Sequence, residues 1–399
     1  MRAPRTDTIA LSALAAVAAV GIAFMILRSS GASTDPLAAV PADSFMIVSI
    51  DIPALAESPI GQALVGDGGT RAGTLLGVDS ITATCGFDPL PHLRAVALAI
   101  PEGPVGQAGE PERGDFGVAA SGSLAKEALE SCSKAVIAKR GGEARVEQKG
   151  SFTVVSDARS PASAEVAFRD GGPYLVGKGA WLTRMIDAAD GRVPSTLSAR
   201  DAHAELRADL TTRDLDAEAI RATAILPESV RARVEREMEL EASAARDGSV
   251  NEPRRGLKLM EGVLGVSAAA FGIHAGRDQP HEDDTRFVAE LRCDTEAACD
   301  AVSTLILHTR LGWSGNLAYR LLGLGPLIDN LTVERAGAPK TALFVRTHAP
   351  AGNLARVLSR ALDAAPPKKP ATAVPAKADE ASPAHPDAGR PNGPGADKR

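Results

Sequence analysis

The sequence predicts an α+β protein of two similar units, each an antiparallel sheet with helices packed on one side, preceded by a single transmembrane helix. Segments such as RFVAELRC at 286–293 alternate apolar and polar residues, the pattern of an antiparallel strand with one buried face. The same order of elements, strand, helix, two strands, long helix, strands and helix, occurs twice along the chain. Neither copy has the glycine-rich strand-to-helix turn of a doubly wound nucleotide-binding fold.

The first unit is expected over residues 38–195. Its short apolar runs, such as FMIVSIDI and RAVALAI, are typical of buried strands, and the longer segments between them predict helices. In chain order we predict strand Phe45–Ile52, helix Pro53–Val65, strands Arg94–Ile100 and Phe116–Ser121, helix Leu124–Lys139, strands Phe152–Ser156 and Ala164–Val176, and helix Ala180–Ala189.

The second unit is expected over residues 196–364, with the elements in the same order. We predict strand Ala202–Leu210, helix Asp214–Ile225, strands Val266–His274 and Arg286–Cys293, helix Thr295–Thr309, strands Leu331–Arg335 and Ala342–Thr347, and helix Gly352–Ala361.

One charged helix is inserted in the second unit at 227–247 and has no counterpart in the first. A Pro and Glu228 at its start suit a helix N-terminus. Its apolar residues Val230, Val234 and Met238 form a narrow stripe between Glu and Arg residues, which predicts either a partner-binding helix or a charged helix lying on the domain surface.

The N-terminal region predicts a signal anchor in the bacterial cytoplasmic membrane. Thr8–Leu27 is uncharged, and about 20 helical residues span about 30 Å, the thickness of a bilayer core. Arg2 and Arg5 favour a cytoplasmic location for residues 1–7. The alternative is a cleaved signal peptide, whose apolar region normally has about 7–15 residues. In either case the body lies in the periplasm or outside the cell.

Two further segments are not predicted to fold. Residues 28–37 form a linker between the membrane helix and the body. Residues 365–399 are rich in Pro, Ala and Lys and contain no aromatic residue, Ile or Leu, so they cannot bury enough apolar surface to offset the entropy of ordering. We expect this tail to be disordered.

The four cysteines are Cys85, Cys132, Cys293 and Cys299. In an oxidising compartment an even number predicts disulfides, and four cysteines allow three pairings. The local choice is Cys85 with Cys132 and Cys293 with Cys299. A metal site would require a CxxC pair or convergent histidines, which the sequence lacks, and we expect no cofactor.

Composition excludes some partners. The chain has a net charge of −6 although both ends are positively charged, so its body is acidic, which argues against binding of nucleic acid. Aromatic residues make up only 3%, too few for a carbohydrate or single-strand platform built on stacked rings.

Two phrases resemble a known group of proteins. Pro41–Ile52 (PADSFMIVSIDI), and Cys85–Leu90 (CGFDPL) leading into a strand, are similar to openings found in uncharacterised secreted or membrane-anchored bacterial proteins with a single N-terminal hydrophobic segment. The resemblance implies an exported α+β body and supplies no catalytic residues. The alternative explanation is that Pro-Ala-Asp-Ser simply turns the chain into its first strand.

Two classes of function remain. We favour a binding or scaffold module of the cell envelope with an envelope protein partner. The alternative is a serine acyl transferase of the penicillin-recognising type, in which Ser123 would be the nucleophile, Lys126 its base, Ser314–Asn316 the S-x-N motif and Lys340 the carboxylate-binding residue. A second S-x-x-K at Ser131 shows that the pattern occurs by chance, and the sequence shows no convergent His/Asp/Glu set.

Overall fold

The structure is a computed structural model of the whole chain. It describes residues 35–66, 78–101, 115–161, 163–199, 201–212, 218–228, 231–232, 235–236, 239, 264–274, 284–321, 323–336 and 341–363. The predicted membrane segment Thr8–Leu27, the linker up to residue 34 and the tail 365–399 lie outside these residues. In the described part, no helix is both long and apolar enough to cross a membrane.

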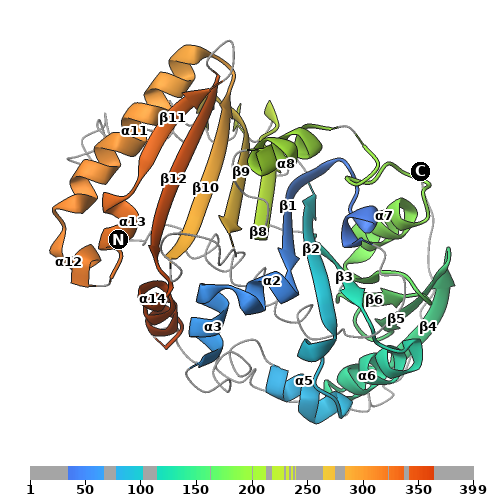
Figure 1. Cartoon of the computed structure of the whole chain (residues 1–399). Coiled ribbons are helices and arrows are strands. Elements are labelled where there is room, and N and C mark those ends of the chain that lie inside the picture. Colours follow the sequence, from blue (N-terminus) through green and yellow to red (C-terminus); the bar gives the residue numbers. More distant parts are fainter. Residues whose placement is uncertain are drawn as a thin grey trace, which may run out of the picture.

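The core of the protein is a single antiparallel sheet of twelve strands in the order β11-β12-β10-β9-β8-β1-β2-β3-β7-β6-β5-β4 (Figure 1). The strands are β1 (Ser44–Asp51), β2 (Leu93–Pro101), β3 (Gly117–Gly122), β4 (Ala144–Lys149), β5 (Phe152–Asp157), β6 (Glu165–Phe168), β7 (Tyr174–Gly177), β8 (Glu218–Ile225), β9 (Val266–His274), β10 (Asp284–Cys293), β11 (Thr332–Ala336) and β12 (Ala342–Pro350).

Helices and short 3-10 turns connect and cover these strands. They are η1 (Pro36–Ala39), α2 (Ile52–Glu57), α3 (Pro59–Gly66), α5 (Val78–Cys85), η2 (Leu90–His92), α6 (Lys126–Lys139), α7 (Gly179–Ala189), α8 (Ala202–Thr212), α11 (Glu296–Ser314), α12 (Leu317–Leu321), α13 (Gly325–Asp329) and α14 (Ala351–Asp363).

The strand order is similar on both sides of the β1–β8 pair. Going outward, β1, β2, β3 and β7 on one side correspond to β8, β9, β10 and β12 on the other. A long helix follows the third strand in each case, α6 after β3 and α11 after β10. The two sides join through antiparallel pairing, in which Ile47 is opposite Thr223 and Ile50 is opposite Ile220. The body is therefore one continuous sheet and not two separate ones.

Both faces of this sheet are covered, so the prediction of helices on one side is wrong. Along β2, Ala97 and Ala99 belong to a buried cluster with α7, while Val96 and Leu98 belong to another that includes Leu129 of α6. Alternate residues of a strand point to opposite faces, so both faces of β2 are buried. Helices α7 and α8 pack on one face, and α2, α3, α6, α11 and α14 on the other.

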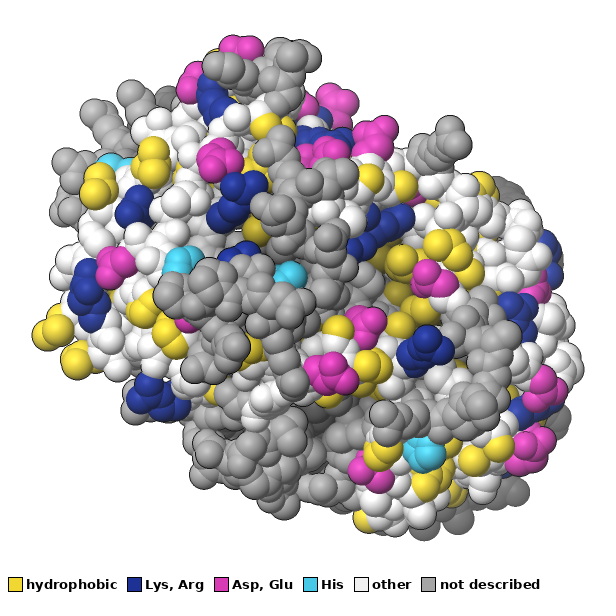
Figure 2. All heavy atoms as spheres, in the orientation of Figure 1, with side chains coloured by type: hydrophobic (Ala, Val, Ile, Leu, Met, Phe, Trp, Pro, Cys, Tyr) yellow, Lys and Arg dark blue, Asp and Glu magenta, His cyan; other side chains and the backbone are white. Residues whose placement is uncertain are grey.

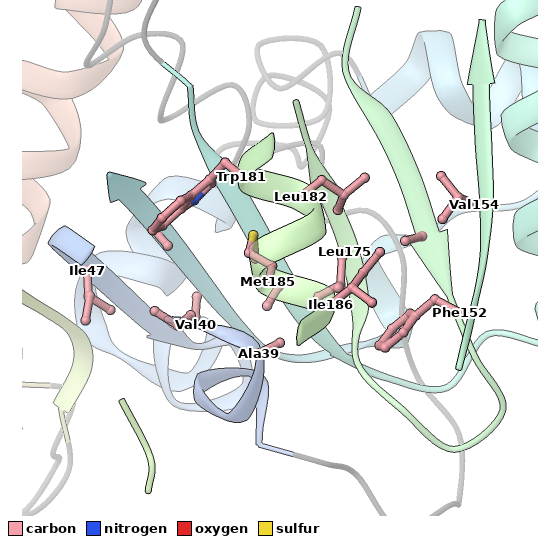
Figure 3. Packing of buried hydrophobic residues seen from close by; sticks show 14 residues of the cluster. Ala39, Val40, Ile47, Phe152, Val154, Leu175, Trp181, Leu182, Met185 and Ile186 are labelled. Atoms are coloured by element: carbon pink, nitrogen blue, oxygen red, sulfur yellow. The ribbon is translucent and has the colours of Figure 1, made fainter. Parts of the chain in front are cut away.

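The core under α7 shows how closely one of these layers packs. Figure 3 shows Leu182, Met185 and Ile186 of α7 among the side chains of the neighbouring strands. All three are at most 1% exposed. Gly117 on β3 has no side chain and so leaves room for the sulfur of Met185. The small residues of this sheet face let α7 lie close to the strands.

Two predicted elements have the opposite secondary structure. Ala202–Leu210, predicted as a strand, lies in helix α8, and most of the predicted helix Asp214–Ile225 is strand β8. Leu206 and Leu210 are four residues apart and fully buried, a helical spacing that packs α8 against β9 and β10. In the second half of the sheet, the strand that corresponds to β1 is therefore β8, and not the segment 202–210.

Smaller differences concern breaks in predicted elements. The predicted helix Pro53–Val65 is two helices, α2 and α3, because the hydroxyl of Ser58 accepts a hydrogen bond from Gly61 N and caps the second helix. The predicted strand Ala164–Val176 is the hairpin β6–β7. Helices α5, α12 and α13 and edge strand β4 were not predicted.

His203 of α8 connects the two sides of the sheet. Its Nε2 donates to the carbonyl oxygen of Ser44, at 2.8 Å, and its Nδ1 accepts from the hydroxyl of Thr223, also at 2.8 Å. A backbone carbonyl can only accept, so Nε2 carries the proton of the neutral imidazole and Nδ1 is left to accept from the Thr223 hydroxyl. Burial lowers the pKa of His203 below its ordinary value.

We therefore expect the free energy of unfolding to decrease in acid. The unfolded chain binds a proton at His203 more readily than the folded protein, so stability is lost as the pH falls below about 6.5. His203→Gln, which keeps a neutral donor and acceptor, should make this pH dependence shallower in urea titrations between about pH 5 and 7.5. Equal slopes for the two proteins would contradict this assignment.

Candidate functional site: an exposed apolar tip

The most unusual surface of the molecule is at one end of the sheet, where α11 ends and α12 follows (Figure 1). Helix α11 begins at the N-cap Thr295, whose hydroxyl accepts from Ala298 N at 3.1 Å. Cys299 and Val302 on its first turns are buried against Leu343 of β12. The last turns of α11 and the short helix α12 form what we call the α11–α12 tip, residues 307–321.

Large apolar side chains of the tip are exposed to solvent. Leu311, Leu317 and Leu321 are 73%, 68% and 72% exposed, and Leu307 and Trp313 are exposed as well. Elsewhere among the described residues, the exposed large apolar side chains are Val146, Leu197 and Phe271, at 42%, 54% and 37%. Figure 2 shows hydrophobic side chains on the surface of this end of the molecule. Gathered apolar exposure of this kind makes the tip a candidate binding surface.

The tip has a defined conformation. The rings of Trp313 and Tyr319 lie against each other, with centroids 5.2 Å apart. Arg320 donates from Nε to the carbonyl oxygen of Ser314, at 2.8 Å, and from Nη2 to Asp329, at 3.1 Å. Arg310 also donates to the carbonyl oxygen of Asp329, at 2.9 Å. These contacts fix α12 against the end of α11, so the leucines are held outward.

The tip also differs from the rest of the chain in charge. Between Asp300 and Asp329 the sequence contains no Asp or Glu, and its charged residues are Arg310 and Arg320. The whole chain, in contrast, has a net charge of −6. The exposed leucines therefore lie on a basic segment of an acidic protein.

The partner-binding stripe that we predicted, Val230, Val234 and Met238, lies outside the described residues. In that insertion, residue 227 is described and is not helical, whereas the other described residues, 228, 231–232, 235–236 and 239, are helical. Arg231 forms an ion pair with Asp294, just before α11, so the insertion begins near the start of that helix. The proposed role of the stripe stays a prediction.

The acyl-transferase motifs do not come together. Ser123 and Lys126 lie where β3 leads into α6, and α6 packs on the β4–β6 end of the sheet. Ser314 and Asn316 lie in the tip, at the opposite end (Figure 1). Lys340 lies outside the described residues. A nucleophile and its partners must be within hydrogen-bond reach of one another, so this arrangement does not support a penicillin-type site.

The structure forms both disulfides with the local pairing that the sequence analysis favoured. Cys85 at the end of α5 is bonded to Cys132 of α6, and Cys293 at the end of β10 to Cys299 of α11. Such bonds persist in oxidising compartments, so they indicate an extracytoplasmic location. In the described residues no three His, Cys, Asp or Glu side chains gather to hold a metal ion.

The tip was not predicted, although two signals of it are visible in the sequence. One is the long stretch without an acidic residue. The other is the segment LGWSGNL at 311–317, in which two leucines and a tryptophan stand among Gly, Ser and Asn, residues that are common on protein surfaces. Periodicity alone cannot show which face of α11 lacks a partner, because that depends on where the sheet ends.

Comparisons with known proteins add little. No family model matches the chain, and no curated protein is similar to it. A solved structure titled "Structure of crystal form III of TP0453" aligns with a TM-score of 0.40 at 12% identity, covering 82% of this chain and 99% of that one. The structure of crystal form I of TP0453 aligns with a TM-score of 0.39 at 11% identity, covering 84% and 99%. A likeness this low assigns neither a family nor a function.

Proposed function

We propose that this protein is a single-pass, membrane-anchored binding or scaffold module whose body lies in the periplasm or outside the cell. The observation that carries the proposal is an exposed apolar tip on a disulfide-bonded body. An isolated soluble protein gains nothing from holding several leucines in water, whereas a binding protein uses them for contact.

The anchor in this proposal is the segment Thr8–Leu27, followed by the linker 28–37. The described structure starts at Asp35, and η1 packs directly on β2 and β3, so the tether enters the body near the middle of the sheet. The seven linker residues before Asp35 can extend about 25 Å, which keeps the body next to the membrane. The insertion 227–247 is a second candidate contact, for an envelope protein partner.

A topology experiment tests the proposal. The full-length protein should sediment with membranes and resist extraction by alkali. Protease added to opened envelopes should degrade the body and leave a short N-terminal fragment protected, because residues 1–7 lie on the cytoplasmic side. Protease added to intact cells distinguishes a body in the periplasm, which stays protected, from a body on the cell exterior, which is degraded.

Two results would contradict this topology. Recovery of a soluble mature form that starts near Thr34 would replace the anchor by a cleaved signal peptide. Complete protection of the body in opened envelopes would place it in the cytoplasm.

A further inference from the structure

We infer that the α11–α12 tip binds the surface of a negatively charged membrane, with its leucines and Trp313 inserted at the level of the headgroups. This inference rests on the proposed function, since it assigns the contact surface of the anchored body. The membrane is the one that holds the N-terminal segment.

The types of residue favour lipid over a protein partner. The exposed large apolar side chains of the tip are four leucines and one tryptophan. Tryptophan and arginine are common among the residues that dominate protein–protein binding energy, but leucine, which supplies four of these five side chains, is under-represented there. Leu and Trp together with Arg are the usual composition of helices that lie in a membrane interface, where the indole ring occupies the headgroup region.

The spacing also suits an interfacial contact. Leu307 and Leu311 are four residues apart on α11, and Leu317 and Leu321 are four residues apart on α12, so each pair lies on one face of its helix. The Trp313–Tyr319 ring contact holds the two helices next to each other. The last turns of α11 and the short helix α12, with their outward leucines, can enter the headgroup layer without crossing the bilayer.

Charge determines which part of the body faces the membrane. Arg310 and Arg320 lie in the tip, and Asp329 at its base offsets only one of them. Basic residues near an anionic surface are attracted by about 1 kcal/mol each, whereas the acidic remainder of the body is repelled. An anionic membrane therefore selects the tip as the contact surface.

Trp313 provides a direct readout in the full-length protein. The chain has two tryptophans, and the other, Trp181, is a buried residue of α7 itself. The Trp181→Phe variant reports on Trp313 alone, and Trp313→Phe is its matched control. Both are reconstituted into vesicles of phosphatidylglycerol or of phosphatidylcholine that carry brominated acyl chains, which quench tryptophan at short range.

In phosphatidylglycerol vesicles we expect bromine quenching of Trp313, protection of Trp313 from aqueous acrylamide, and no quenching of Trp181. Quenching should be much weaker in phosphatidylcholine. Each leucine removed from hydrocarbon should lower the ratio of docked to undocked tip about tenfold, so Leu311→Ser with Leu317→Ser should lower it about a hundredfold. Leu197→Ser, at an exposed leucine in another part of the body, should change nothing.

Two outcomes would overturn the inference. In the first, acrylamide quenches Trp313 and brominated lipid does not, while the protein still resists extraction by alkali. This result would contradict insertion of the tip and leave the proposed anchor intact. The other is equal quenching in both lipids, which contradicts an anionic surface. Loss of the protein from the vesicles altogether is instead a failure of the proposed anchor. If Trp181→Phe does not fold, the difference between the wild type and Trp313→Phe gives the same signal.

Discussion

Removal of the Cys85–Cys132 disulfide is expected to lower the free energy of unfolding by about 4 kcal/mol. The two cysteines are 47 positions apart, so the bond restricts a long loop in the unfolded chain. Cys293 and Cys299 are only 6 positions apart, and loss of their bond should cost about 2 kcal/mol by the same chain-entropy argument. Urea denaturation of the two paired Cys→Ser variants under oxidising conditions measures both values.

The test depends on which disulfide contributes more to the free energy of unfolding, and we expect the larger contribution from Cys85–Cys132. A larger loss for the Cys293–Cys299 pair would show that chain entropy is not the main contribution of these bonds. A separate check is alkylation of the folded, non-reduced protein, which should label no cysteine. Labelling of two or more cysteines would contradict the disulfides themselves.

Leu98→Ala and Leu182→Ala are each expected to destabilise the protein by about 2–5 kcal/mol, the usual cost of a cavity in a packed core. Leu98 points from β2 toward the layer that contains α2 and α6, while Leu182 lies in α7 on the other face. Because the sheet is buried on both faces, we expect the two variants to lose comparable free energy of unfolding. Thermal and urea unfolding of the two variants measure them.

Leu197→Ala is the control for these variants because Leu197 is 54% exposed and its truncation leaves no cavity. Its effect should stay within about 0.5 kcal/mol. If Leu182→Ala were as mild as this control, the α7 layer would not be part of the core, and the prediction of helices on one side would be restored.

Much of the fold could be predicted from alternation along the chain. The predicted strand Val266–His274 has the same bounds as β9, since turn residues and charges mark both of its ends. The helix after β10 was also predicted, although it runs on to Ser314. Strands and helices with a strong pattern are predictable because the pattern reflects a single buried face.

The wrong predictions lie where tertiary packing determines the secondary structure or the layers of the fold. Residues 202–210 fit a two-residue and a helical repeat almost equally well, and only the burial of Leu206 and Leu210 against the sheet selects the helix. The second helical layer was missed because small residues such as Ala97 and Ala99 do not look like a core face, yet they receive α7. A strand buried on both sides loses the alternation that predicts one open face.

The candidate site was missed for a related reason. Leu307 and Leu311 have the spacing of ordinary core residues, and nothing local shows that the sheet ends before it reaches them. The disulfides, in contrast, were predictable, because export and an even number of cysteines limit the pairings to three. Local sequence thus predicts covalent links better than it predicts an unpartnered surface.

The central claim, that the exported body contacts the membrane through the α11–α12 tip, is tested most directly by photocrosslinking in living cells. A diazirine analogue of leucine is placed at Leu317, and at the exposed Leu197 as the control position. We expect irradiation to give adducts with the mass of a phospholipid at position 317 and none at position 197. Adducts with a protein at position 317, or equal lipid labelling at both positions, would contradict the account.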